Sequence, residues 1–217
     1  MLPVSSEFYP SLQEYIQALS QEFAFIPADR QPKLAQLTAY MQQRVAIGEP
    51  AKLTFICTHN SRRSHLAQLW AQTAAYYYQI PGVEAYSGGT EVTAFNPRAV
   101  AALRRSGFEI EELVPGMDLP GYTVRLGAGV EPIRAFSKLY DAAGNPTHDF
   151  CAVLTCSDAD AGCPFIPGAN ARVYLPYDDP KAFDDTEQEA AQYDERTRQI
   201  ARELFYAFSR VKGAGNE

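Results

Sequence analysis

The sequence predicts an α/β protein with a four-stranded, mainly parallel sheet, and three observations favour it. Short apolar runs of strand length alternate with longer segments whose apolar residues recur at helical spacing. The run at residues 53–56 is apolar apart from Thr54, which is typical of a strand covered on both faces. Because strands that alternate with helices form parallel sheets with right-handed crossovers, we expect three layers.

We expect an N-terminal helical extension over residues 1–50 and one further domain over residues 51–212. In the extension, residues 11–23 and a second segment that ends at Gly48-Glu49-Pro50 have helical spacing. The expected strands of the domain are residues 53–56, 83–87, 152–155 and 173–175. Its expected helices are residues 64–78, a segment from Asn96-Pro97 to about Gly107, and residues 186–211.

An insertion is expected near the edge of the sheet, at about residues 116–149. This stretch contains many Gly and Pro residues and has no clear helical pattern. Residues 130–140 are predicted to form a β-hairpin or an edge extension, which ends at Gly144-Asn145-Pro146.

Composition excludes several classes of function. The 217 residues carry a net charge of -7, which does not favour nucleic acid or anionic membranes as partners. There is no apolar run long enough to cross a bilayer, and the first ten residues do not resemble a secretory signal. Four cysteines are too few for a disulfide scaffold. We therefore expect a cytoplasmic protein whose thiols serve the core or chemistry.

The most informative segment joins the first expected strand to the first helix of the domain, and it reads Cys57-Thr58-His59-Asn60-Ser61-Arg62-Arg63-Ser64. A helix N-terminus at the carboxyl end of a parallel strand is a site for anions, and its field also favours a thiolate. Arg63 could bind a tetrahedral oxyanion in a bidentate manner, and Ser64 could donate a hydrogen bond to the sulfur. Asn60 tolerates the left-handed conformation that a tight loop needs. The alternative is that Cys57 is a small core residue.

A second cysteine pair, Cys156 and Cys163, follows the third expected strand. The end of that strand lies on the same side of the sheet as Cys57, and the six residues between the cysteines are small or acidic. No metal site is expected, because this spacing exceeds that of common ligand pairs. The pair is either two unrelated buried thiols or a redox pair that exchanges disulfides. Cys151 is interpreted as structural.

An acidic turn, Asp178-Asp179-Pro180, follows the fourth expected strand. A carboxylic acid here could face the anion site and donate a proton to a leaving oxygen. A solvated acidic turn is the commoner fate of two adjacent aspartates.

The loop resembles the phosphate-binding loop of the low-molecular-weight protein tyrosine phosphatase superfamily, Cys-x5-Arg-Ser. The run from Leu154 to Pro164 is similar to the resolving segment of the thioredoxin-coupled arsenate reductases of that superfamily. His59 stands where the family usually has Gly, and Arg62 where it usually has Cys. The resemblance covers residues 52–115 and 150–211 and implies a phosphatase I-like fold.

This resemblance implies an arsenate reductase. Cys57 would attack arsenate, Arg63 and the loop residues would bind the oxyanion, and Asp179 would be the general acid. A relay through Cys57, Cys156 and Cys163 would pass a disulfide to thioredoxin, with no tightly bound cofactor. A potassium ion is a further implication, with Asn60 and Ser87 as ligands. Gln68 stands where the family often has Glu, which weakens such a site. The residues that would bind the oxyanion are Thr58, His59, Asn60, Ser61, Arg62, Arg63 and Ser64.

Two alternatives remain open at this point. A phosphatase acting on phosphotyrosine or a small phosphoester would use Cys57, Arg63 and Asp179 and ignore the other thiols. A non-catalytic relative would bind an oxyanion or a partner without turnover. The run from Cys156 to Cys163 favours the reductase.

Overall fold

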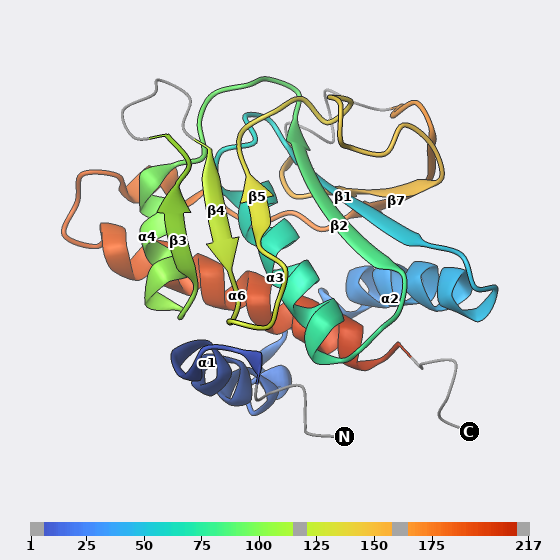
Figure 1. Cartoon of the computed structure of the whole chain (residues 1–217), viewed down its shortest axis with the longest axis horizontal. Coiled ribbons are helices and arrows are strands. Elements are labelled where there is room, and N and C mark those ends of the chain that lie inside the picture. Colours follow the sequence, from blue (N-terminus) through green and yellow to red (C-terminus); the bar gives the residue numbers. More distant parts are fainter. Residues whose placement is uncertain (1–6, 115–120, 158–164, 212–217) are drawn as a thin grey trace.

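The fold contains a parallel four-stranded sheet, which lies at the upper right of Figure 1. The computed structural model describes residues 7–114, 121–157 and 165–211. The strand order is β2-β1-β6-β7, and all three pairings are parallel. The strands are β1 (Ala51–Cys57), β2 (Val83–Gly89), β6 (Phe150–Leu154) and β7 (Ala169–Tyr174). The predicted α/β class with a four-stranded parallel sheet is confirmed.

Helices cover one face of this sheet. The helices α2 (Gln31–Ala46) and α3 (Arg63–Tyr77) contact the strands directly, and the long α6 (Glu189–Ser209) packs against both of them. The helices α1 (Pro10–Ser20) and α4 (Pro97–Arg105) lie against α6. Short 3-10 helices cover Phe23–Phe25 and Pro180–Phe183. No helix within the described ranges is both long and apolar enough to span a membrane.

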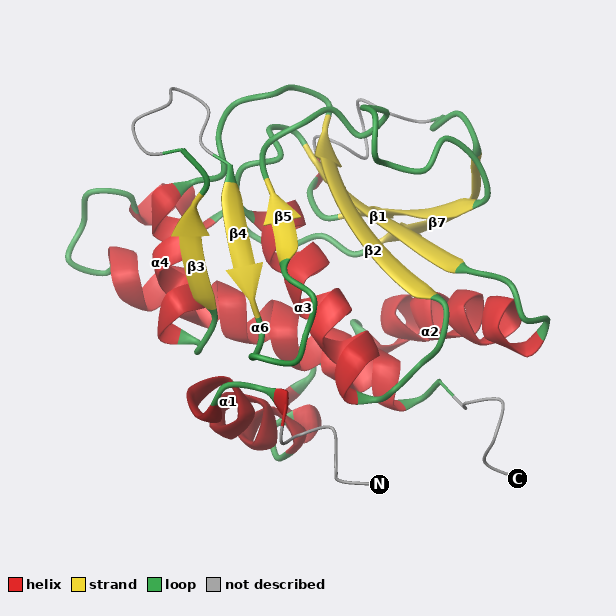
Figure 2. Cartoon of the chain, in the orientation of Figure 1, coloured by secondary structure: helices red, strands yellow, loops and turns green. Residues whose placement is uncertain are grey.

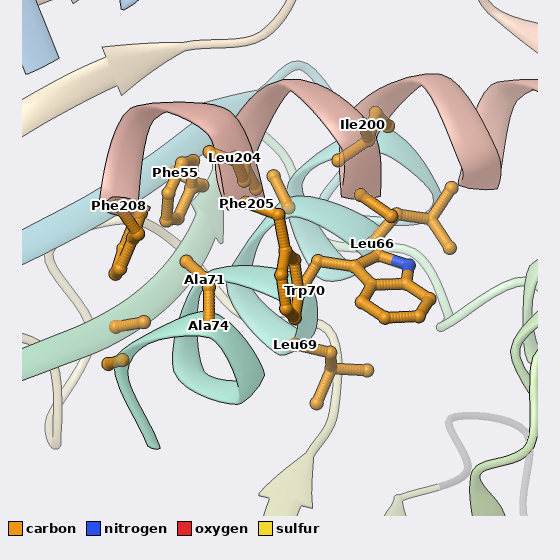
Figure 3. Packing of buried hydrophobic residues seen from close by; sticks show 14 of the residues in the cluster. Phe55, Leu66, Leu69, Trp70, Ala71, Ala74, Ile200, Leu204, Phe205 and Phe208 are labelled. Carbon is orange, nitrogen blue, oxygen red and sulfur yellow. The ribbon is translucent and has the colours of Figure 1, made fainter. Parts of the chain in front are cut away.

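The main core lies between the sheet and these helices. Trp70 of α3 is fully buried, stacks on Tyr15 of α1 and meets Phe205 of α6 edge to face. Figure 3 shows the apolar side chains of α3 facing those of α6. A second buried cluster, on Ile56, Leu154 and Ile166, covers the other face of the sheet and also contains Cys57 and Cys156.

The N-terminal helices share the main core. Leu12 of α1 and Leu34 of α2 are fully buried in it. Arg30, the residue before α2, makes an ion pair with Glu203 of α6 at 2.6 Å, and both side chains are buried. The division of the chain at residue 50 stays a prediction, and the two predicted parts are packed against each other.

The insertion forms most of a second sheet, which Figure 2 shows beside the first. The antiparallel order is β3 (Glu109–Glu112), β4 (Tyr122–Arg125) and β5 (Ile133–Ala135). The prediction of a hairpin within residues 130–140 is wrong, because that range contains only β5, and the hairpin is formed by β4 and β5 over residues 122–135. The predicted edge extension exists, because Gly89 at the end of β2 donates to the carbonyl of Lys138 and accepts from the amide of Tyr140.

Candidate active site

The strand register brings the carboxyl ends of three strands together. Cys57, the last residue of β1, lies opposite Gly89 of β2, and Ile56 lies opposite Leu154 of β6. A Cβ atom on Gly89 would lie 2.7 Å from both the carbonyl oxygen of Thr58 and the amide nitrogen of Asn60. Only glycine therefore lets β2 approach the loop of residues 58–62 this closely.

The Cys57 sulfur is buried beside a hydrogen-bonded pair of polar side chains. Its Sγ atom lies 3.0 Å from Oγ of Ser64, which in turn lies 2.9 Å from Nδ2 of Asn60. Asn60 has a φ of 43°, the left-handed conformation expected from the sequence. The loop thus places a hydroxyl group where it can donate to the sulfur.

The loop carbonyls are bonded to surrounding segments. The carbonyl of Thr58 accepts from the amide of Glu91, and that of Ser61 accepts from the amide of Asn96. The carbonyl of His59 accepts from two hydroxyls, those of Thr93 and Ser137. Between described residues, no hydrogen bond is donated by a backbone N–H of residues 58–62. Such N–H groups at the start of a helix can bind an anion.

Arg63 and Asp179 meet beside this loop. Nη2 of Arg63 lies 2.8 Å from Oδ2 of Asp179, and Nη1 donates to the carbonyl of Tyr177 at 3.1 Å. Arg62 lies 3.7 Å from the same carboxylate and donates to the hydroxyl of Tyr193. The neighbouring Asp178 is exposed and pairs with Arg196 instead. The structure thus brings Asp179, and not Asp178, to the loop.

Two open pockets adjoin these groups. One of about 670 Å³ is lined by Arg63, Asp179 and Ser157, the residue after Cys156. The other, of about 280 Å³, is lined by His59, Ser61, Arg62 and Lys181. His59, where the family usually has Gly, lies 3.4 Å from Glu91 at the exposed rim. A small oxyanion can therefore approach the loop from solvent.

Cys156 also lies against the loop. Its Sγ atom is 3.6 Å from Oγ1 of Thr58, and its side chain is buried in the cluster that contains Cys57. Cys163 lies outside the described residues. Burial raises the pKa of the Cys151 thiol to about 12, so this cysteine remains protonated and suits its structural interpretation.

The residues predicted for potassium offer a poor fit. Oγ of Ser87 and Oε1 of Gln68 are buried oxygens without a hydrogen-bond partner in the described structure, which would suit a cation. Oδ1 of Asn60, however, already accepts the amide of Lys138 at 2.9 Å. Gln68 supplies no negative charge. The ammonium of Lys138 lies close enough to His65, which contacts Asn60, to lower the pKa of His65, and the same positive charge would repel a potassium ion. Among the described residues, no cluster of three His, Cys, Asp or Glu side chains could hold a metal.

Several contacts of the loop have no signal in the sequence motif. Residues 137 and 138 of the insertion bond to the loop through the hydroxyl of Ser137 and the amide of Lys138. His65, directly after the motif, contacts Asn60 through Nδ1 at 3.3 Å. Tyr193 comes from the distant helix α6. Most of these partners come together only in the tertiary fold. His65 is the one that the sequence could have indicated, because it directly follows the motif at the start of a predicted helix.

Comparison with known proteins identifies related sequences. No protein-family model matches the chain. The chain is 33% identical over 129 residues to arsenate reductase 2 of Staphylococcus epidermidis, covering 58% of this chain and 76% of that protein. It is 29% identical over 145 residues to the arsenate reductase of Bacillus licheniformis, covering 66% and 84%. The chain belongs to the arsenate reductase family and is an enzyme of this type, as the sequence predicts.

Two solved structures show lower sequence identity to the chain. A low-molecular-weight phosphotyrosine phosphatase of Vibrio cholerae has a TM-score of 0.47 and 14% identity, covering 73% of this chain and 94% of the phosphatase. A thioredoxin-dependent arsenate reductase of Corynebacterium glutamicum has a TM-score of 0.41 and 20% identity, covering 92% and 87%.

Proposed function

We propose that the protein reduces arsenate to arsenite through a relay of three cysteines. Arsenate binds to the free N–H groups of residues 58–62 and to the guanidinium of Arg63. The Cys57 thiolate attacks arsenic, an S–As bond forms, and an oxygen leaves as water after accepting a proton from Asp179. This first step changes no oxidation state.

The second step is the reduction. The thiolate of Cys156 attacks the sulfur of Cys57, which forms an S–S bond and breaks the S–As bond. The electron pair of the broken bond stays on arsenic, which leaves as arsenite. Cys163 then attacks Cys156, which releases the Cys57 thiolate and leaves a Cys156–Cys163 disulfide. A dithiol protein of the thioredoxin class reduces this disulfide, so the cycle needs no bound organic cofactor.

The observation that carries this proposal is the contact between Cys156 and the loop. Sγ of Cys156 lies 3.6 Å from the hydroxyl of Thr58, the residue that follows Cys57. Because both cysteines belong to one buried cluster, a disulfide between them requires local rearrangement only. A phosphatase has no use for a second buried thiol at this position. A reducing cytoplasm, in which such thiols persist, remains the predicted location.

The relay is tested with the Cys163→Ser variant, which can complete the first two steps only. We expect one arsenite per enzyme molecule, followed by a stall with a Cys57–Cys156 disulfide that peptide mass spectrometry detects. The matched control is Cys151→Ser, because Cys151 lies buried in β6 outside the relay. Sustained turnover by Cys163→Ser would contradict the relay.

The grouping of Cys57, Arg63 and Asp179 also favours a second candidate, a phosphomonoester hydrolase. Such an enzyme would form a cysteinyl-phosphate on Cys57 and would need neither Cys156 nor Cys163. A double variant, Cys156→Ser with Cys163→Ser, that hydrolyses an aryl phosphate rapidly would support this candidate. Tight oxyanion binding without any covalent adduct on Cys57 would instead indicate a non-catalytic relative.

A further inference from the structure

The side-chain amide of Asn60 has one allowed orientation. Its Oδ1 lies 2.9 Å from the backbone nitrogen of Lys138, which can only donate. Nδ2 must therefore donate its two hydrogens to the remaining neighbours, Oγ of Ser64 at 2.9 Å and Nδ1 of His65 at 3.3 Å. It follows that Nδ1 of His65 is an acceptor and that its ring proton sits on Nε2.

His65 is held as a neutral imidazole. The ring is fully buried and stacks on Phe95, with centroids 4.0 Å apart and planes 10° from parallel. Burial and the nearby ammonium of Lys138 lower the pKa of His65 to about 3. Nδ1 thus carries a lone pair at any pH where the enzyme would work. The backbone of Phe136 and the backbone of Asn60 also interact with the ring, and they offset part of this lowering of the pKa.

The donor and acceptor roles in these hydrogen bonds determine which group donates to the Cys57 sulfur. Because Ser64 accepts a hydrogen from Asn60, its own hydroxyl hydrogen is left for the Cys57 sulfur 3.0 Å away. A hydrogen bond donated to sulfur favours the thiolate, which is the attacking form. If Nδ1 of His65 did not accept the second N–H of Asn60, that N–H would be buried without a partner. The cost of leaving it unpaired would favour a different orientation of the amide.

We propose that His65 is a positioning residue for the Cys57 nucleophile. By accepting the second N–H of Asn60, it holds the amide so that the chain from Lys138 through Asn60 and Ser64 ends in a hydrogen bond donated to the sulfur. His65 touches neither the substrate nor the reacting atoms. This inference rests on the proposed role of Cys57 as a thiolate nucleophile.

Two substitutions of His65 separate its hydrogen bond from its packing. His65→Phe keeps an aromatic ring against Phe95 but removes the acceptor. His65→Asn removes the ring but places an amide oxygen near the position of Nδ1. Phe95→Leu is the packing control, because it removes the stacking partner and leaves the acceptor in place.

The readout is the rate at which iodoacetamide alkylates Cys57 as a function of pH, followed on the Cys57 peptide by mass spectrometry. We expect the midpoint to rise by about one pH unit in His65→Phe, a tenfold loss of thiolate below the midpoint, as one lost hydrogen bond to a charged group predicts. Inorganic phosphate should protect Cys57 less well in this variant. In His65→Asn the midpoint should return most of the way to the wild-type value. Phe95→Leu should lower the melting temperature and leave the midpoint unchanged.

Two results distinguish failure of this inference from failure of the proposed function. An unchanged midpoint in folded His65→Phe, or an equal shift in His65→Asn, would overturn the role of His65 and leave the relay untouched. A wild-type midpoint no lower than that of a free thiol, about 8.5, would count against the nucleophile itself and so overturn both.

Discussion

Nη2 of Arg63 lies 2.8 Å from Oδ2 of Asp179, which joins the group proposed to bind the oxyanion to the group proposed to protonate its leaving oxygen. The two residues come from the start of α3 and the segment after β7 and are 116 positions apart. An oxyanion that binds Arg63 competes with Asp179 for the same guanidinium. Substrate binding would thereby separate the carboxylate from the guanidinium and leave it free to face the leaving oxygen.

Replacing Asp179 by Asn should remove proton donation while retaining the shape of the side chain. We expect the turnover rate with arsenate to fall by about 10²- to 10⁴-fold, the usual contribution of a general acid. Phosphate binding should be kept or strengthened, because Arg63 loses a competing anion. Steady-state kinetics and phosphate protection of Cys57 measure the two effects. Asp178→Asn is the matched control and should change neither, since its side chain is 94% exposed and pairs with Arg196.

Gly89→Ala should damage the oxyanion loop without touching its motif. The new Cβ would lie 2.7 Å from the amide nitrogen of Asn60 and would also clash with the carbonyl oxygen of Glu91, so the backbone must shift. We expect phosphate affinity to fall at least tenfold, measured by titration calorimetry. Gly129→Ala is the control, because its Cβ would meet nothing closer than 3.8 Å. Equal affinities in the two variants would show that the loop tolerates the shift.

Stability should depend on pH through His65. Its pKa is about 3 in the folded protein and about 6.5 in the unfolded chain. Because the unfolded chain binds the proton first as pH falls, this residue destabilises the fold by about 1.4 kcal/mol per pH unit between roughly pH 6 and 4. Urea unfolding should therefore show a steeper loss of stability in the wild type than in His65→Phe. Parallel curves would contradict a neutral, buried imidazole.

The N-terminal helices should depend on the buried pair of Arg30 and Glu203. Removing the carboxylate by Glu203→Ala leaves a guanidinium buried without its charged partner, which costs about 3–5 kcal/mol of unfolding free energy. Glu49→Ala removes an exposed partner of Arg44 at 3.7 Å and should cost less than about 1 kcal/mol. Denaturant unfolding compares the two. Similar losses would mean that the buried pair contributes no more than a surface one.

Local patterns predicted the parallel sheet and the loop because the signals lie within short segments. The apolar run of β1, the cap of α4 by Asn96 and the left-handed Asn60 each follow from neighbouring residues. The strand β3 was missed because only Ile110 of its four residues is buried, so its alternation is too short to detect.

The partners of the loop could not be predicted, because they come from distant parts of the chain. Lys138 contacts Asn60 through its backbone amide, and no side-chain type signals such a bond. The acceptor role of His65 depends on that same amide, since Lys138 fixes which way Asn60 points. The predicted position of Cys163 lies outside the described residues and stays a prediction.

The relay is tested most directly by arsenate-dependent oxidation of NADPH, with the reduced protein coupled to thioredoxin and thioredoxin reductase. We predict steady consumption in the wild type and in Cys151→Ser, and none beyond a single turnover in Cys57→Ser, Cys156→Ser or Cys163→Ser. No consumption by the folded wild type, with the coupling enzymes verified on a known disulfide, would contradict the arsenate reductase proposal and favour the phosphatase.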